Sequence, residues 1–357
     1  MPYQPRVLLV IADSSRTGGP EHVLTLAREL EEAGWRSAVA CPPGELVDRC
    51  DALGIATLAL ATRGRELSLA PIRLRQMARR FHADLVHSHG LRAGWLARRA
   101  RLGSPWVHTH HLDAWFTTRA WRVAAHRHEL RAIGRRAQLQ IAVSQSVFEF
   151  VTGAVGTPPA RVRVVPNGIH PLQPRLRLEP EGARVGILAS LVPSKGVDLA
   201  VMALATPAGR GLSLVVGGEG PELAALVDLA ERLQVAGRVS FVGPVSDRQL
   251  FFDSCDVVWV SSRAEPFGQV ACEAMSAGLP VVAARVGGLP EILDPPRAGI
   301  LVAPANPTAL ASVTSALLAN TERYQRLSEA GPERVRQRYS AARMGALTRG
   351  VYREVLE

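Results

Sequence analysis

Short apolar runs alternate with longer amphipathic segments along this chain, and this alternation constrains its fold more than any other sequence feature. Runs such as residues 7–12 and 257–260 have the length of buried strands, and a helical pattern follows each of them. Strands that alternate with helices in this way form βα units, whose strands lie parallel and whose helices cover both faces of the sheet. The sequence therefore predicts an α/β protein with doubly wound parallel sheets.

The alternation continues through all 357 residues, which is too long for one ordinary domain. In the first half, we predict strands at residues 7–12, 37–41, 85–88, 105–110, 140–143 and 163–165, and helices at 21–33, 71–80, 91–102 and 147–155. In the second half, we predict strands at 184–189, 213–217, 239–242, 257–260, 280–283 and 299–302.

A polar, proline-rich stretch at residues 173–182 has no apolar period and is typical of a linker. We predict a first domain over residues 1–170, a linker over 171–183 and a second domain over 184–335. A helical, basic segment follows, and we expect residues 336–357 to form a helix that crosses back to the first domain. Two doubly wound sheets joined by a linker leave a crevice, and we expect a ligand to bind there at the carboxyl ends of the strands.

The positive charge of the chain lies entirely in its first half. Residues 1–170 hold 23 Arg, no Lys and 13 Asp or Glu, whereas residues 171–357 hold 18 Arg, one Lys and 19 acidic residues. The formal charge of +10 therefore leaves nucleic acid and a membrane surface open as partners. The hydrophobic fraction of 47% excludes a disordered chain.

The cysteines and the apolar stretches indicate the cellular compartment of the protein. Four cysteines show neither CxxC spacing nor a secreted disulfide framework, so we expect a reducing cytoplasm. The N-terminal apolar run is too short for a signal peptide. Prolines interrupt the uncharged stretch at residues 298–321, and we expect no transmembrane helix.

Two glycine-rich turns each follow a predicted strand and open a predicted helix. The first contains Gly18 and Gly19, and the second contains Gly218 and Gly220. Glycines let a backbone approach a ligand closely, and a helix N-terminus favours a phosphate. In the first turn, a tight βα connection without a ligand would use the same residues, and this turn is not the GxGxxG fingerprint of dinucleotide binding.

Five of the ten histidines lie between residues 87 and 111. Strand alternation places His87 and His89 on one face and separates His108 and His110 from His111. Zinc binding is the main alternative to substrate binding for these histidines. Zinc usually takes further Cys or carboxylate ligands nearby, and neither strand end offers a matching set, so we expect no metal. We favour His111, which ends its strand, for holding a polar substrate; polar strand ends without a function remain the alternative.

The second half of the chain contains the more specific candidate residues. Lys195 is the only lysine, and it stands at a loop-to-helix turn where a compact ammonium suits a diphosphate. Glu265 and Glu273 lie eight residues apart, and a helix that begins near Gly268 would present the backbone amides of Gln269 and its successors to an anion. One carboxylate could then bind a ribose diol while the other faces a sugar.

Together these residues resemble the retaining glycosyltransferases of family 4, which have the GT-B fold of two facing Rossmann-like domains. The resemblance covers nearly the whole chain. Its motifs are Gly18-Gly19-Pro20-Glu21, Thr109-x-His111, Val165-Pro166-Asn167-Gly168-Ile169, Lys195-Gly196, Gly218-Glu219-Gly220-Pro221, the pair Glu265 and Glu273, and Gly287-Gly288-Leu289-Pro290-Glu291.

The resemblance implies a role for each matching residue. The residues implied to be catalytic are Lys195 on the diphosphate, Glu265 on the donor hexose, and His111 on the sugar near the reacting carbon. The residues implied to bind the donor are Gly18, Gly19, Ser190, Lys195, Gly218, Gln269, Val270 and Glu273, with Glu273 on the ribose and the amides of Gln269 and Val270 on the departing diphosphate. Candidates on the acceptor side are His87, His89 and Asn167.

The sequence departs from the family at Ser190, where members commonly carry an arginine five residues before the lysine. Arg16 or Arg263 could replace that arginine. No Asp-x-Asp occurs, in keeping with a metal-independent site without a cofactor. The resemblance implies transfer with retention from a UDP-sugar, or less often GDP-mannose, to a cell-envelope saccharide, a lipid-linked acceptor or a small molecule.

Two other functions stay open. One is a sugar-nucleotide 2-epimerase of similar fold, and the other is a nucleic-acid binder that uses the basic first half and its aromatic residues Trp95, Trp106, Trp115, Phe116 and Trp121. For a transferase, we expect no nucleic-acid partner. We expect instead a cytoplasmic protein attached to the inner face of the cell membrane, with Trp115, Phe116 and Trp121 as an anchor. The arginines at helical spacing are Arg73, Arg75, Arg79, Arg80, Arg92, Arg98, Arg99, Arg101, Arg119, Arg122, Arg127, Arg131, Arg135 and Arg136.

Overall fold

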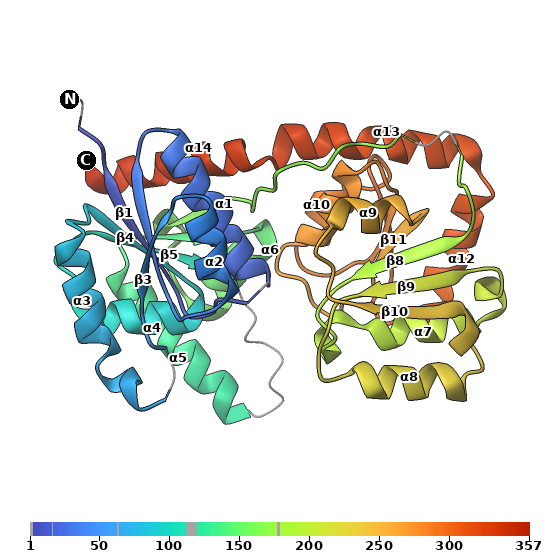
Figure 1. Ribbon diagram of the computed structural model, residues 1–357, viewed down its shortest axis with the longest axis horizontal. Helices are drawn as coiled ribbons and strands as arrows, with labels where there is room; N and C mark the ends of the chain where they lie inside the picture. Colours follow the sequence, from blue (N-terminus) through green and yellow to red (C-terminus); the bar gives the residue numbers. More distant parts are fainter. Residues whose placement is uncertain (1–2, 16, 63, 112–119, 177–178) are drawn as a thin grey trace. The chain divides into compact units, whose positions relative to one another are not determined.

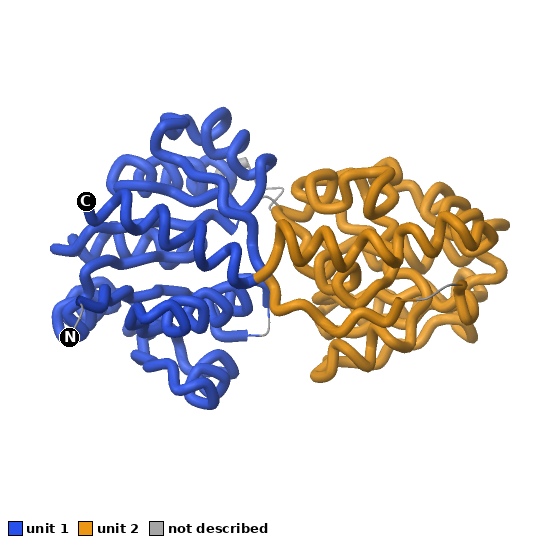
Figure 2. The backbone as a smooth tube through the Cα atoms, turned by 90° about the horizontal axis from the view of Figure 1, so that it is seen from above, with its two compact units in different colours: residues 1–168, 341–357 blue, residues 169–340 orange. Residues whose placement is uncertain are grey.

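The chain folds into two compact units (Figure 2). Unit 1 comprises Met1–Gly168 and Ala341–Glu357, and unit 2 comprises Ile169–Ser340. The computed structural model describes residues 3–15, 17–62, 64–111, 120–176 and 179–357, the side chains of 120–122 excepted. Each unit is built around a parallel sheet of its own (Figure 1).

The described residues of unit 1 form a seven-stranded parallel sheet in the order β3-β2-β1-β4-β5-β6-β7. Its strands are β1 (Arg6–Ile11), β2 (Arg36–Cys41), β3 (Ala56–Ala59), β4 (Leu85–His89), β5 (Trp106–His110), β6 (Leu139–Ala142) and β7 (Val162–Val164). The chain order reverses between β1 and β4, and ligands of open α/β sheets bind beyond the carboxyl ends of strands at such a switch point.

Helices cover both faces of this sheet, as the near-continuous burial of its central strands requires. Helices α1 and α14 pack together on one face, and α3, α4 and α5 lie side by side on the other (Figure 1). The helices of unit 1 are α1 (Gly18–Glu32), α2 (Glu45–Ala52), α3 (Ala70–Arg80), α4 (Gly90–Ala100), α5 (Ala120–Arg136), α6 (Gln145–Glu149) and α14 (Ala341–Leu356).

Unit 2 repeats the same topology, with six strands among its described residues in the order β10-β9-β8-β11-β12-β13. The strands are β8 (Arg184–Leu188), β9 (Ser213–Gly217), β10 (Val239–Gly243), β11 (Val257–Val260), β12 (Val281–Ala284) and β13 (Ile300–Val302). The helices are α7 (Val197–Ala205), α8 (Leu223–Arg232), α9 (Arg248–Asp253), α10 (Gln269–Ser276), α11 (Leu289–Leu293), α12 (Pro307–Leu318) and α13 (Thr321–Arg338). Its switch point lies between β8 and β11.

The predicted fold class is confirmed, and every predicted strand exists within two residues of its predicted bounds. Strand β3 and helix α2 escaped prediction because they are short and mostly exposed, so they leave no hydrophobic period. The C-terminal segment also differs from expectation: α13 continues to Arg338 in unit 2, and a separate helix, α14, begins at Ala341 in unit 1. Within the described residues, no helix is long and apolar enough for a membrane crossing.

The core of unit 1 contains histidines on both faces of its sheet, as the alternation predicted. On the α14 face, His87 is fully buried, with Nδ1 2.6 Å from the hydroxyl of Tyr352 and Nε2 2.7 Å from that of Thr109. On the α4 face, His110 Nε2 lies 2.7 Å from Gln140 Oε1. The α14 helix is thus joined to the sheet by a buried polar contact as well as by apolar packing.

Replacing Tyr352 with Phe should destabilise unit 1. The change leaves His87 Nδ1 buried without a partner, which costs about 1–3 kcal/mol in the free energy of unfolding. Thermal or urea unfolding measures the loss. Arg353→Ala, on the exposed face of the same helix, is the matched control and should stay within about 0.5 kcal/mol of the parent. Equal effects of the two substitutions would contradict the prediction.

Stability should fall as the pH drops from about 6.5 towards 4. Burial lowers the pKa of His110 to about 4, with the bond to Gln140 opposing the fall, and burial likewise lowers the pKa of His22 to about 4. Because both values lie below the ordinary pKa of 6.5, the unfolded chain binds more protons in this window. Each histidine should then cost up to about 1.4 kcal/mol per pH unit.

Melting temperatures between pH 7 and 4.5 check this dependence. His128→Ala removes an exposed histidine and should leave the slope unchanged, whereas His110→Gln should reduce it. A melting temperature that stays flat below pH 6.5 in the parent protein would show that these histidines do not control acid stability.

Candidate functional site

The candidate donor residues of unit 2 follow the carboxyl ends of neighbouring strands. Ser190 and Lys195 follow β8, Gly218 follows β9, and Glu265 follows β11. Because the carboxyl ends of parallel strands share one edge of the sheet, these loops meet there, at the switch point between β8 and β11.

Lys195 is held in a short 3₁₀ turn, Pro193–Lys195, directly before α7. Gly196 follows with φ +63°, and a Cβ at this position would lie 2.2 Å from the carbonyl oxygen of Ser261. Glycine therefore allows the Lys195 turn to lie against the loop after β11. Lys195 Nζ donates to Glu265 Oε2 at 2.7 Å, and Ser262 Oγ donates to the same oxygen at 3.1 Å.

The loop that carries Glu265 is held from the other side by the turn after β12. Gly288 N donates to the carbonyl oxygen of Glu265 at 2.9 Å. Gly287 has φ +52°, and a Cβ there would lie 1.9 Å from the same oxygen. The Gly287-Gly288 motif therefore supports the catalytic candidate Glu265 through its backbone.

Glu273 lies one turn inside α10 and is buried, with only 5% of its surface exposed. Its Oε1 accepts a hydrogen bond from Arg248, the first residue of α9. Sequence reasoning missed Arg248, since no local pattern links it to α10, a helix that begins much later in the chain, at Gln269. Gln269 and Val270 are half-buried in the first turn of α10, after Gly268 with φ +120°.

Ser190 is exposed. Arg263, one of the two arginines that could replace the missing family arginine, is already paired with an acidic residue. Both terminal nitrogens of Arg263 donate to the carboxylate of Asp198, at 2.7 and 2.6 Å, and one also donates to the carbonyl of Pro193. Arg16 lies outside the described residues. Gly218 has φ +125°, and a Cβ there would lie 2.0 Å from the carbonyl oxygen of Ala189, so the two turns pack closely.

At the switch point of unit 1, Gly18 and Gly19 begin α1 directly after the loop from β1. Among the residues that the structure describes, a Cβ on Gly19 would meet only Ile11 Cδ1, at an ordinary 3.5 Å. These residues therefore place no steric demand for glycine at this position, unlike at Gly196 or Gly218.

Three imidazoles gather at the same edge of the unit 1 sheet. His89 ends β4, the half-buried His111 follows β5, and His22 is the fifth residue of α1. His89 Nδ1 lies 3.3 Å from His111 Nε2, and the ring centres of His22 and His111 are 4.8 Å apart. Burial lowers the pKa of all three, so the rings are neutral at pH 7. Sequence reasoning missed His22 because it lies far from His89 and His111 along the chain.

The other acceptor-side candidates surround this group. The ring of His87 packs against that of His89 with centres 4.0 Å apart. Nδ1 of His87 is hydrogen-bonded to Tyr352, and Nε2 of His87 is hydrogen-bonded to Thr109. Asn167, which is buried, lies beside His22 and opposes the fall in its pKa, although no hydrogen bond of good geometry joins the two side chains.

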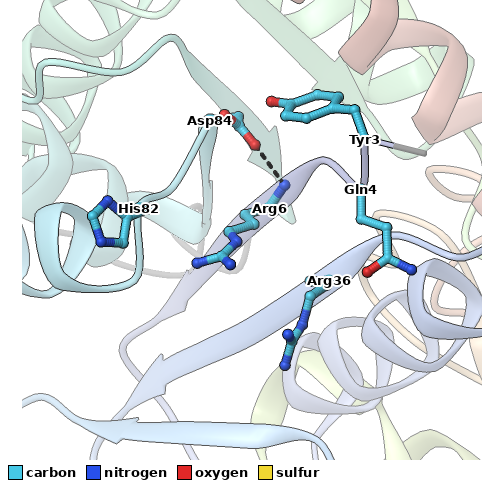
Figure 3. A pocket seen from close by; sticks show the side chains of 6 residues that line it. All are labelled: Tyr3, Gln4, Arg6, Arg36, His82 and Asp84. Carbon is cyan, nitrogen blue, oxygen red and sulfur yellow. Dashed lines mark hydrogen bonds between the residues drawn. The ribbon is translucent and has the colours of Figure 1, made fainter. Parts of the chain in front are cut away.

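A separate hollow of about 340 Å³ lies at the opposite edge of the same sheet (Figure 3). It is lined by Tyr3, Gln4, Arg6, Arg36, His82 and Asp84. Because Arg6 and Arg36 are the first residues of β1 and β2, this hollow stands at the amino ends of the strands. It takes no part in the candidate site.

Family profiles match both halves of the chain. The profile described as Glycosyltransferase Family 4 matches residues 16–171, and the one described as Glycosyl transferases group 1 matches residues 172–334. The D-inositol 3-phosphate glycosyltransferase of Acidothermus cellulolyticus is 32% identical over 308 residues, which are 76% of this chain and 67% of that protein.

An uncharacterized glycosyltransferase of Methanocaldococcus jannaschii is 32% identical over 61% of this chain and 60% of its own length. For eight curated relatives that it matches, the chain spans between 52% and 67% of the relative's length. The crystal structure of Anabaena HepE in complex with UDP and glucose covers 97% of this chain and 98% of its own, with 22% identity and a TM-score of 0.84.

That likeness, over nearly the full length of both chains, confirms the predicted GT-B fold. The two profiles and the relatives confirm the predicted family. The chain belongs to glycosyltransferase family 4.

Proposed function

We propose that the protein transfers a hexose from a nucleoside diphosphate sugar to a hydroxyl group of an acceptor, with retention of configuration and without a metal ion at the donor. The contact that supports this proposal best is the one between Lys195 and Glu265 at the switch point of unit 2. A cation and a carboxylate lie there next to the N-terminus of α10, which is the combination that a diphosphate joined to a sugar needs.

The donor would rearrange this ion pair. The diphosphate carries more charge than Glu265 and competes for Lys195 Nζ, so Glu265 is released to accept hydrogen bonds from the sugar hydroxyls. Breaking the bond between the anomeric carbon and the diphosphate oxygen leaves that electron pair on the phosphate. Lys195 and the amides of Gln269 and Val270 stabilise this developing charge, as an anion hole does.

The remaining roles follow the family resemblance. Glu273 binds the ribose hydroxyls, and Arg248 holds its carboxylate in place. In unit 1, His111 holds the sugar near the reacting carbon. Gly19 brings backbone towards the phosphate, and the absence of a steric demand for glycine there agrees with this role. The acceptor oxygen attacks the anomeric carbon on the face that the diphosphate leaves, and its proton passes to a β-phosphate oxygen.

UDP-sugars are the favoured donors, ahead of GDP-mannose. The HepE structure contains UDP and glucose, and several relatives are named as transferases that act on D-inositol 3-phosphate. We propose a saccharide, lipid-linked or small-molecule acceptor of the cell envelope. A screen that measures release of UDP or GDP from a panel of nucleotide sugars, with D-inositol 3-phosphate among the acceptors, tests both choices.

Lys195→Ala should lower turnover of the nucleotide sugar by at least about 100-fold, because the leaving diphosphate loses its cation. Donor turnover and the melting temperature are measured together, so that loss of activity is separated from loss of folding. Arg232→Ala, an exposed position on α8 of the same unit, is the control and should keep full activity. Normal turnover by the Lys195 variant would refute the assignment.

The same assay separates the transferase from the two other functions. Exchange of the proton at the second carbon of the donor sugar, in the absence of any acceptor, would identify an epimerase instead. Binding of DNA or RNA that persists at physiological salt would identify a nucleic-acid protein.

We also propose that unit 1 attaches to an anionic membrane surface through α3. Ile72 in this helix and Leu69 at its N-cap are exposed, 57% and 50% accessible, and Arg75, Arg79 and Arg80 of the helix are exposed as well. Apolar side chains flanked by arginines are typical of interfacial helices. Other arginines of the basic face are engaged, since Arg98 pairs with Glu129. The expected anchor of Trp115 and Phe116 lies outside the described residues, as does the side chain of Trp121.

Arg75→Glu combined with Arg79→Glu should lower binding to anionic vesicles at least about tenfold, since each basic residue near such a surface contributes about 1 kcal/mol. Sedimentation with anionic and with neutral vesicles measures the partition. Arg232→Glu combined with Arg297→Glu makes the same change of charge on exposed positions of unit 2 and should have a smaller effect. Equal partition of the parent protein to both kinds of vesicle would refute the electrostatic attachment.

A further inference from the structure

Three imidazoles converge at the carboxyl edge of the unit 1 sheet from three different elements. His22 comes from α1, His89 from the end of β4, and His111 from the residue after β5. One ring nitrogen of each lies within 4.8 Å of the corresponding nitrogens of the other two. His22 and His89 are buried, with 2% of each exposed, and His111 is half-buried.

Several nitrogens of this cluster are buried without a hydrogen-bond partner. These are both ring nitrogens of His22 and Nε2 of His89, within the described part of the chain. Buried polar side-chain atoms in folded proteins nearly always have a partner. A neutral imidazole carries one lone pair, so a group that accepts lone pairs could take one nitrogen from each ring, and it would give one nitrogen of His22 a partner.

We propose that His22, His89 and His111 bind a single divalent transition-metal ion. Zinc lies about 2.0–2.1 Å from imidazole nitrogens, so two such ligands of a tetrahedral ion stand about 3.3 Å apart. The separation of 3.3 Å between His89 Nδ1 and His111 Nε2 already matches this geometry. The other separations, which reach up to 4.8 Å, would have to shorten by side-chain movement before one ion could contact all three rings.

The ligand set also selects the class of metal. Neutral nitrogen ligands suit Zn²⁺, Ni²⁺, Cu²⁺ and Co²⁺, whereas Mg²⁺ and Ca²⁺ prefer oxygen. Three histidines leave a fourth position of a tetrahedral ion open for water or another ligand.

A second layer of side chains supports the cluster. The ring of His87 packs against His89 and is itself fixed by Tyr352 and Thr109, so it limits the rotation of His89. Asn167 lies beside His22. Side chains that orient the ligands in this way raise the metal affinity of a site.

The consequence for activity rests on the proposed function. His111 cannot offer the same nitrogen to a metal ion and to the sugar, so Zn²⁺ should inhibit transfer, although the donor chemistry of unit 2 uses no metal. Metal binding itself needs no substrate, and its measurement stands even if the transfer reaction is not found.

The test uses the full chain without a histidine tag, freed of metal with EDTA and then dialysed. Calorimetric titration with Zn²⁺ should show one ion per chain, and Co²⁺ should give the visible absorption of a four-coordinate nitrogen site. His22→Asn, His89→Asn and His111→Asn should each weaken Zn²⁺ binding at least about tenfold. His128→Ala, an exposed position on α5, is the control and should bind as the parent does.

Melting temperatures of the metal-free variants show which of them are folded, and His111→Asn, at the half-buried position, is the least disruptive. If a variant unfolds, Zn²⁺ binding by the parent protein still tests the site. Failure of the parent to bind Zn²⁺ at 100-fold excess over protein would overturn the site. Binding that stays unchanged in folded His111→Asn would overturn it as well. Binding of Zn²⁺ without inhibition of an active transferase would overturn only the shared use of His111.

Discussion

The parallel order of the strands is the constraint on which the rest of this structure depends. In both units the chain order reverses at the first strand, between β1 and β4 and between β8 and β11. Loops from neighbouring strands therefore end at one edge, and residues far apart in sequence become neighbours there. Lys195 and Glu265, separated by 70 residues, meet at 2.7 Å for this reason.

Glycine decides how closely those loops pack. Gly196, Gly218 and Gly287 each have positive φ, and a Cβ at any of them would collide with a backbone oxygen of the next loop. Their role in unit 2 is thus structural first: they bring the loop backbones together so that the ion pair can form. Gly19 in unit 1 has no such obligation, which is why its backbone is the better candidate for approach to a ligand.

Burial sets the chemistry of unit 1. Its buried histidines, His22, His87, His89, His108 and His110, are removed from water on the two faces of the sheet, and desolvation keeps them uncharged at neutral pH. Neutral imidazoles on the α1 face can accept hydrogen bonds from a sugar or bind a metal ion, whereas His87 is fully engaged in joining α14 to the sheet. The same residue type therefore serves packing at His87, whereas His89, two residues away, is a candidate for ligand binding.

The sequence by itself determined the fold class, all the described strands except β3, and the family, because buried parallel strands leave apolar runs and the motifs occur in order along the chain. It also placed Lys195, Glu265 and Glu273 on loops or helix starts. Only the tertiary structure decided the partners of these residues: Arg248 for Glu273, Asp198 for Arg263, and His22 for His89 and His111. Such pairs join separate elements, and no local period records which side chains two elements will bring together.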